Sequence, residues 1–402
     1  MLLRRSSTNI HKFGKIIFLR ESSSLPVNQS SSHDDSTNKN TMFDNKLKQQ
    51  MSERIPRIEK IEVTYEGRGI ADNAVMYMNK HLSTPYHCAM HISHGLAQRG
   101  VIALVKPQNN EEQNDEVNQD NVIDNKEEDP SLIYSMNQPL DADCRLQFLK
   151  FNMSQATPWH HQQVNKAYWR SCAFILGAIT KDAFQTSFSP HVYKFPDISE
   201  KSGAFCCDIV LDEAVKDWKV TEESLVYLTK LARGIISKQL KFEPLLVEPE
   251  FAMEMFHKDN YRRSEIEKFH EKNPLLPISV YRLGNYIDVT SGPLIMNTSM
   301  IFHYVVTAIH KLHSNANVNS WRMQGLSLPE DLKVHHTVWS LLEKRARKLV
   351  REDMYDNDTC TSSSSNKENL LKYESIENKT KIYSKATGQW VNNKWASADP
   401  TR

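Results

Sequence analysis

Alternating and helically spaced apolar residues divide the chain into two folded regions. In the first, residues 58–151, the segments 58–65 (IEKIEVTY) and 101–105 (VIALV) have the short apolar pattern of buried strands. Residues 83–100 between them predict a helix, with Ser83 or Thr84 as its N-cap and Pro85 in its first turn. Residues 133–151 supply two more short strands. We therefore expect a small α+β domain here.

The second region, residues 159–351, mixes longer helices with strands. The pattern predicts, in chain order, a helix over 165–179, a strand over 202–212, a helix over 221–240, a hairpin over 278–289, a strand over 301–310 and a helix over 341–353. Thr221 is the expected N-cap of the 221–240 helix, and Gly284-Asn285 is the expected hairpin turn. This region is also predicted to be α+β.

The N-terminal residues have the composition of a targeting signal. The first basic residues are Arg4, Arg5, Lys12, Lys15 and Arg20, and no acidic residue comes before Glu21. With frequent serines and a possible apolar helical face, this composition predicts a mitochondrial transit peptide and hence a protein of the mitochondrial matrix. The alternative is a disordered basic tail. Residues 1–45 are expected to hold the transit peptide and a flexible arm.

Two further polar stretches interrupt or follow the folded regions. Residues 108–129 are rich in Asn, Asp, Glu and Gln and lack aromatic residues, so we expect a disordered acidic insertion within the first domain. An acidic partner-binding tract is the alternative. Residues 354–402 are rich in Ser, Asn and Lys without sustained periodicity, which predicts a low-complexity tail.

Charge and cysteine content narrow the class of protein. The 402 residues carry 50 Lys+Arg and 49 Asp+Glu, a formal charge of +1. A protein buried in ribosomal RNA is usually far more basic, so RNA contact is expected in patches beside wider protein contacts. The six cysteines form no CxxC pair, which indicates free thiols in a reducing compartment. No apolar run has the length of a membrane span.

Two segments of the second region carry a family resemblance. The first keeps Ser171, Cys172, Ala173, Leu176 and Gly177, and the second keeps Tyr286, Asp288, Gly292 and Pro293. The first set of residues resembles the surroundings of the HxxxH signature of the threonyl-tRNA synthetase editing domain, and the second set resembles those of its CxxxH signature. The first region, through 83–105, resembles the ubiquitin-like (β-grasp) TGS domain that precedes it in those enzymes. The resemblance implies a TGS-like domain at 58–151 and an editing-like α+β domain at 159–351.

The positions that bear the chemistry differ from the family pattern. Where the resemblance places His, His, Cys and His, this chain has Arg170, Phe174, Thr290 and Leu294. Arginine stays protonated and cannot act as a base, and phenylalanine and leucine have no polar atom. None of the four is a good zinc ligand. We therefore predict a protein that is not an enzyme, with no catalytic residue, metal or cofactor. About fifty residues follow the second domain, and an aminoacylation domain needs more than that. We therefore do not expect aminoacylation activity.

Other clusters of metal-binding residue types have plainer interpretations. His87, Cys88, His91 and His94 would place their three imidazoles on one helical face, where a metal site is possible but a solvated or RNA-facing surface is preferred. Cys206 and Cys207 point to opposite faces of a strand and cannot chelate together.

Basic residues near the end of the second domain are the candidate RNA contacts. They are Lys344, Arg345, Arg347, Lys348 and Arg351. A solvated helix face is the alternative, but several cations on one helix suit rRNA phosphates. Arg170 is a further candidate contact, with a pocket-filling salt bridge as the alternative. Arg262-Arg263 is a weaker candidate of the same kind.

The combined likeness extends to mitochondrial ribosomal proteins similar to a threonyl-tRNA synthetase truncated after its editing domain. It rests on the phrases MNKHLSTPYHCAMH, MNQPLDADCRLQF and YRLGNYIDVTSGPL. The resemblance implies a non-catalytic structural component of the mitochondrial large ribosomal subunit. Its expected partners are the large-subunit rRNA and other mitochondrial ribosomal proteins. The alternatives are a trans-editing deacylase and a tRNA-binding module related to threonyl-tRNA synthetase.

Overall fold

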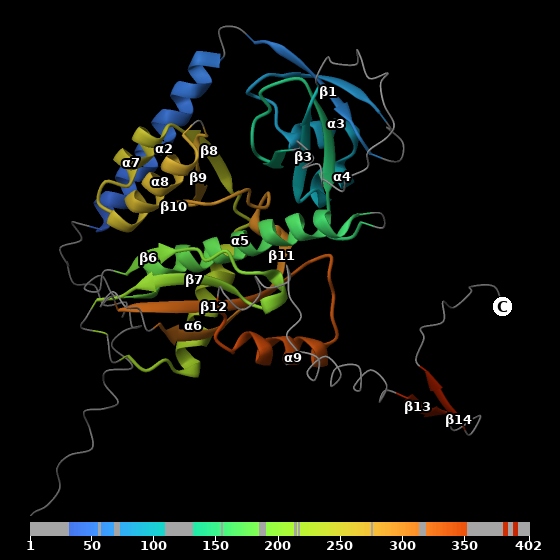
Figure 1. The fold of residues 1–402 in the computed structure, drawn as a ribbon, viewed down its shortest axis with the longest axis vertical. Coiled ribbons are helices and arrows are strands. Elements are labelled where there is room, and N and C mark those ends of the chain that lie inside the picture. The colour runs from blue at the N-terminus through green and yellow to red at the C-terminus, as the bar shows by residue number, and fades with distance from the viewer. Residues whose placement is uncertain are drawn as a thin grey trace, which may run out of the picture. The chain divides into compact units, whose positions relative to one another are not determined.

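The structure is a computed structural model that covers two compact units, Met1–Glu352 and Asp353–Arg402. It describes residues 32–54, 58–67, 73–108, 132–153, 156–184, 190–212, 215, 218–274, 276–312, 319–351, 381–384 and 389–392 (Figure 1). The predicted transit peptide up to residue 31, residues 109–129 of the predicted insertion and nearly all of the predicted tail lie outside the described residues.

A five-stranded mixed sheet forms the first domain of the larger unit. Its strands are β1 (Lys60–Tyr65), β2 (Val75–Asn79), β3 (Ile102–Pro107), β4 (Leu132–Ser135) and β5 (Cys144–Leu149). They lie in the order β2-β1-β5-β3-β4, with β1 and β5 parallel and the other pairs antiparallel. The alternation in 58–65 matches β1, where Ile61, Val63 and Tyr65 are buried. Strand β2 was not predicted.

The segment 83–100 is two short helices instead of the one that was predicted. They are α3 (Pro85–Ile92) and α4 (His94–Arg99), and Ser93 between them is extended at φ −166°. Thr84 is the N-cap of α3, because its hydroxyl accepts from the backbone N of His87 at 3.4 Å. The Thr84 backbone N donates to His87 Nδ1 at 3.1 Å, which completes a capping box. His94 therefore does not continue the helix face of His87 and His91.

A four-stranded sheet is the centre of the second domain. Its strands are β6 (His191–Lys194), β7 (Phe205–Val210), β11 (Ile301–Lys311) and β12 (Ser320–Pro329), in the order β11-β12-β7-β6. Helices α5 (Pro158–Ala183) and α6 (Glu222–Ile236) share one hydrophobic core with it. Cys207 belongs to this core, whereas Cys206 packs with Ala346 of α9 (His336–Ala346), as the predicted alternation requires.

Helix α6 covers the free edge of this sheet. Strand β11 is an edge strand, so alternate backbone groups have no strand partner. The hydroxyl of Thr229 accepts from Val306 N at 3.0 Å, and Arg233 Nε donates to Tyr304 O at 3.3 Å. Thr221 caps α6 as predicted, accepting from Ser224 N. These contacts fix α6 along β11.

A three-stranded sheet, β10-β9-β8, forms a second core in the same domain. Its strands are β8 (Glu243–Val247), β9 (Ile278–Leu283) and β10 (Tyr286–Val289), and it packs with α7 (Pro249–Met255) and α8 (Asn260–Lys272). The hairpin between β9 and β10 turns at Gly284 and Asn285 as predicted, with Gly284 at φ +60°. Short 3-10 helices lie at Glu200–Ser202 and Thr298–Met300.

The helix α2 (Ser32–Arg54) differs from the flexible arm expected up to residue 45. Phe43 is fully buried in the core of the three-stranded sheet, and Met42 and Leu47 pack against that core. Ser36 and Asn40 donate to the carbonyl of Asn285 in the hairpin turn, at 3.3 and 3.0 Å. The helix forms because of these tertiary contacts, since its sequence has few apolar residues.

The last helix and the C-terminal segment also differ from expectation. Helix α9 ends at Ala346, so Lys348 and Arg351 lie beyond it and not on a helix over 341–353. In the smaller unit, β13 (Lys381–Ser384) pairs antiparallel with β14 (Gln389–Asn392), where a low-complexity tail was expected. Among the described residues, no helix combines the length and apolar character needed to cross a membrane.

Candidate functional site

The two predicted signature segments lie side by side in the structure. Ser171 on α5 accepts from the backbone N of Ile295 at 2.9 Å, and its hydroxyl donates to Ala167 O at 2.7 Å. The hydroxyl of Tyr304 donates to Cys172 O at 2.9 Å and fixes the same turn of α5 to β11. Ser171 and Cys172 are fully buried. The residues that carry the family resemblance are therefore packing residues that join α5 to the segment after β10.

Three of the four substituted positions meet at one small cavity. Arg170, Phe174 and Thr290 line it together with Lys166, Trp169, Ala173, Phe195, Pro196, Asp197, Ile198, Phe205, Cys206 and Ser291. The cavity holds about 40 Å³. Ligand pockets usually measure about 300–1,000 Å³, so this space suits a few waters and not the end of an aminoacylated RNA. Leu294 does not line the cavity and is fully buried in the hydrophobic core.

Aromatic rings occupy the interior next to the cavity. The ring of Phe174 lies 5.0 Å from that of Tyr286, 6.0 Å from Phe195 and 6.1 Å from Phe242 between centroids. A Cβ at Gly177 would come within 2.5 Å of the Tyr286 hydroxyl and 3.0 Å of Phe195, which explains the glycine. Phe174 thus contributes buried apolar surface where the resemblance places an imidazole.

Arg170 and Thr290 both make contacts with the loop after β10. The Thr290 hydroxyl donates to Gly292 O at 2.5 Å and accepts from Gly292 N at 3.2 Å, so it stabilises the turn. The guanidinium of Arg170 packs on the same glycine, because a Cβ built there would lie 2.6 Å from its Nη1. Neither residue supplies a base: the hydroxyl is engaged by the backbone and arginine stays protonated.

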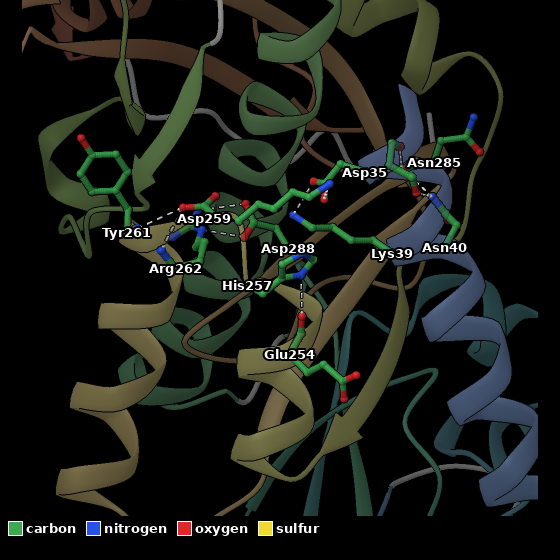
Figure 2. A network of polar contacts seen from close by, with 12 residues as sticks. Asp35, Lys39, Asn40, Glu254, His257, Asp259, Tyr261, Arg262, Asn285 and Asp288 are labelled. Atoms are coloured by element: carbon green, nitrogen blue, oxygen red, sulfur yellow. Dashed lines mark hydrogen bonds and ion pairs between the residues drawn. The ribbon is translucent and has the colours of Figure 1, made fainter. Parts of the chain in front are cut away.

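A buried ion pair holds the second signature segment at Asp288 of β10. Arg262 on α8 contacts Asp288 on β10, with Nη2 2.9 Å from Oδ2, and both residues are buried (Figure 2). The hydroxyl of Tyr286 donates to the same carboxylate at 2.5 Å. Burial and the neighbouring Asp288 carboxylate raise the pKa of Tyr286 well above its ordinary value, so the phenol stays a donor.

Arg262 was a weak RNA-binding candidate in the sequence, and that interpretation is wrong. It is 1% exposed, and its guanidinium also lies 4.9 Å from the Phe195 ring. Its neighbour Arg263 is exposed. The sequence contained no signal that would pair Arg262 with Asp288, because the two residues lie on different elements and meet only in the fold.

The predicted RNA-binding cations near the end of the domain fall into two groups. Arg347 forms an ion pair with Glu222 at 2.7 Å and a second with Glu343 at 3.3 Å. Arg345 donates to the carbonyl of Lys201. Lys344, Lys348 and Arg351 are exposed. All five side chains are exposed, and Arg345 and Arg347 differ from the other three in having a contact within the chain.

The histidines and cysteines do not assemble into a metal site in the described part of the chain. No three His, Cys, Asp or Glu side chains are grouped there so that they could hold an ion. Cys88 is fully buried on α3, while His91 and His94 lie on separate helices. His87 is used in the cap of α3, as described above.

Comparison with known proteins adds relationships that the geometry alone does not give. No family model matches the chain. It is 30% identical over 311 residues to the large ribosomal subunit protein mL39 of Drosophila melanogaster, covering 77% of this chain and 83% of that protein. It is 28% identical over 275 residues to a probable cytoplasmic threonine–tRNA ligase 1 of Dictyostelium discoideum, covering 68% of this chain and 32% of the ligase. The corresponding ligase of Rattus norvegicus is 27% identical over 258 residues, which are 62% of this chain and 30% of the enzyme.

The two kinds of relative differ in how much of their length this chain spans. It spans about a third of the ligases, so the greater part of each enzyme has no counterpart in the match. It spans most of the Drosophila protein, at the higher identity. The mixed helices and sheets of the structure agree with both relationships. The chain belongs to the mL39 family of large ribosomal subunit proteins.

Proposed function

We propose that this chain is a non-catalytic structural component of the mitochondrial large ribosomal subunit. It docks on the large-subunit rRNA and on neighbouring ribosomal proteins and so supports mitochondrial translation. The kinship with mL39 over 83% of the Drosophila protein supports the assembly role. The predicted transit peptide, in the basic segment that ends at Arg20, supports the mitochondrial matrix as its location.

The observation that carries the non-catalytic part of this proposal is the filled pocket. Phe174 lines the site with buried apolar surface, and the cavity that remains measures about 40 Å³. Ester hydrolysis needs a positioned water with a base or a metal, together with room for the substrate. Neither Arg170 nor Thr290 meets the first requirement, and the cavity volume does not meet the second.

The domain assignment forms part of the same proposal. We infer that residues 58–151 are a β-grasp domain of the TGS type and residues 159–351 an editing-like domain. The sheet order β2-β1-β5-β3-β4, with parallel β1 and β5 and helices between β2 and β3, supports the first assignment. The match of this chain to about a third of each threonine–tRNA ligase supports the second.

Binding to RNA is proposed for the exposed cations at the end of the domain. Lys348 and Arg351 are the leading phosphate contacts, because they are exposed and lie beyond the end of α9, whereas Lys344 lies on α9 beside exposed apolar residues. Arg345 and Arg347 are secondary, since each has a contact within the chain. Arg170 is a further proposed RNA contact, from a half-buried position where its guanidinium packs against Gly292.

Sedimentation tests the assembly role directly. In a sucrose gradient of mitochondrial lysate washed with high salt, the protein should migrate with the large ribosomal subunit. Release of the protein into the free fractions would contradict the proposal. Replacing Lys348 and Arg351 together by Glu should lower the salt concentration at which the protein dissociates, whereas Lys230→Glu on the exposed face of α6 should not.

A deacylation assay separates this function from that of a trans-editing enzyme. Purified protein mixed with Ser-tRNA should leave the rate of ester loss at the buffer level. Turnover above that level would overturn the non-catalytic assignment and favour the deacylase alternative. A threonyl-tRNA synthetase with an active editing domain serves as the positive control.

A further inference from the structure

One face of the second domain exposes apolar side chains that a folded monomer normally buries. Leu341 and Val338 on α9 are 61% and 44% exposed, and Phe302 on β11 is 54% exposed. Leu332 and Val334, in the segment that joins β12 to α9, are also exposed. Val338, Leu341 and Phe302 are called the α9 face below. Gathered exposed apolar residues mark interaction surfaces more often than isolated ones do.

A β-bulge lies at Phe302, next to the place where β11 contacts α9. Ile301 pairs with Pro329 and His303 pairs with Leu328, so Phe302 is the extra residue on the edge strand β11. Such a bulge redirects a side chain out of the normal alternation. The Phe302 ring lies 4.3 Å from the His303 ring, and the His303 ring lies 5.0 Å from that of Trp339 on α9. A row of rings therefore connects β11 to the helix.

Helix α9 has an inner and an outer face of different character. Trp339, Leu342 and Ala346 pack into a small core with Leu326 of β12. Val338 and Leu341, three residues apart, lie together on the outer face. Lys344 and Arg345 follow Leu341 by three and four residues, so they continue that face as a cationic end. The outer face is thus apolar in its first half and positive in its second.

We propose that the α9 face binds an amphipathic, acidic segment of a neighbouring protein, an inference that rests on the proposed ribosomal role. Apolar residues of the partner would cover Val338, Leu341 and Phe302, and its carboxylates would face Lys344. An RNA ligand fits this face less well. RNA binds through phosphates and through bases stacked on aromatic rings, whereas Leu341 and Val338 are aliphatic and offer neither contact.

Site-specific photo-crosslinking in the assembled particle tests the proposal. A benzophenone amino acid replaces Leu341 in the full chain, large subunits are purified after a salt wash, and the crosslinked species are sequenced. The expected product is a protein segment that carries both apolar and acidic residues. Crosslinks to rRNA, to a protein segment without acidic residues, or to nothing would each overturn the proposal.

Two further variants serve as controls for the crosslinking experiment: a crosslinker at another exposed apolar position and a charge reversal at Lys344. Val226 on α6 is 67% exposed, so the same crosslinker there should not capture that segment. Lys344→Glu should lower the yield of the Leu341 crosslink about tenfold, because it places a negative charge opposite the partner's carboxylates. Lys230→Glu should leave it unchanged. If the unmodified protein does not sediment with large subunits, the proposed function fails; if it does and the crosslink is absent, only this inference fails.

Discussion

The guanidinium of Arg262 and the carboxylate of Asp288 form a buried, two-pronged ion pair. Arg262 Nε lies 2.7 Å from Oδ1 and Nη2 lies 2.9 Å from Oδ2. Arg262 comes from α8 and Asp288 from β10, so the pair ties the helix to the hairpin strand beneath the filled pocket. The Nη2 contact is a hydrogen bond, whereas the Nε contact is a short ion-pair contact without hydrogen-bond geometry.

Breaking this pair should destabilise the fold strongly. Asp288→Asn leaves the Arg262 charge buried without its main counter-charge, and such changes cost about 3–5 kcal/mol. Urea denaturation of the purified protein measures the loss. The matched control is Glu222→Gln, which breaks the exposed contact to Arg347 and should cost about 0.2–1 kcal/mol. Equal losses in the two variants would contradict a structural role for the buried pair.

The helix α2 should be part of the folded domain and not a removable arm. Phe43 is 0% exposed in the core with Phe256 and Val280, so Phe43→Ala should cost about 3–5 kcal/mol of unfolding free energy. Met51 lies on the same helix but is 43% exposed, and Met51→Ala should change stability by less than about 0.5 kcal/mol. Thermal unfolding of the two variants checks the difference. A Phe43→Ala protein as stable as the parent would show that α2 does not hold the core.

The sequence predicted many of the strands and the helices α5 and α6 because their patterns are local. The hairpin at Gly284-Asn285, the cap at Thr221 and the helix that carries Ser171 and Cys172 all follow from residues close together in the chain. The resemblance also placed Arg170, Phe174 and Thr290 at one site, where the structure brings them together.

What the sequence missed depends on tertiary contacts. Helix α2 has little apolar character of its own, and it forms because Phe43 meets a core made by residues far along the chain. The break at Ser93 and the pairing of Arg262 with Asp288 likewise require the folded surroundings. Leu294 was grouped with the pocket residues, yet it lies in the core behind them.

The described cysteines should resist alkylation while the protein is folded. Burial raises the pKa of Cys88, Cys144 and Cys172 to about 12, so almost no thiolate is present at pH 8. Iodoacetamide treatment at pH 8 followed by mass spectrometry should find these three residues unmodified in the native protein and modified in guanidinium chloride. Modification of Cys172 under native conditions would contradict the packing of α5.

His81 should make the stability of the first domain depend on pH. Partial burial and the nearby charges of Arg54 and Lys80 lower the pKa of His81 below its ordinary value of 6.5. The unfolded chain then binds more protons than the folded one as the pH falls past 6.5. The stability contributed by neutral His81 is therefore complete above that pH and is lost as the pH falls toward the folded-state pKa.

His81→Asn provides the test, because residue 81 has a φ of +60° and asparagine tolerates this left-handed conformation. The variant should show a smaller fall in urea stability between pH 7 and pH 5, a range of about two units around the ordinary histidine pKa. Lys80→Gln should shift the His81 titration, followed by NMR, to higher pH, since it removes a repelling charge. An unchanged slope in His81→Asn would mean that other groups govern the acid sensitivity of this domain.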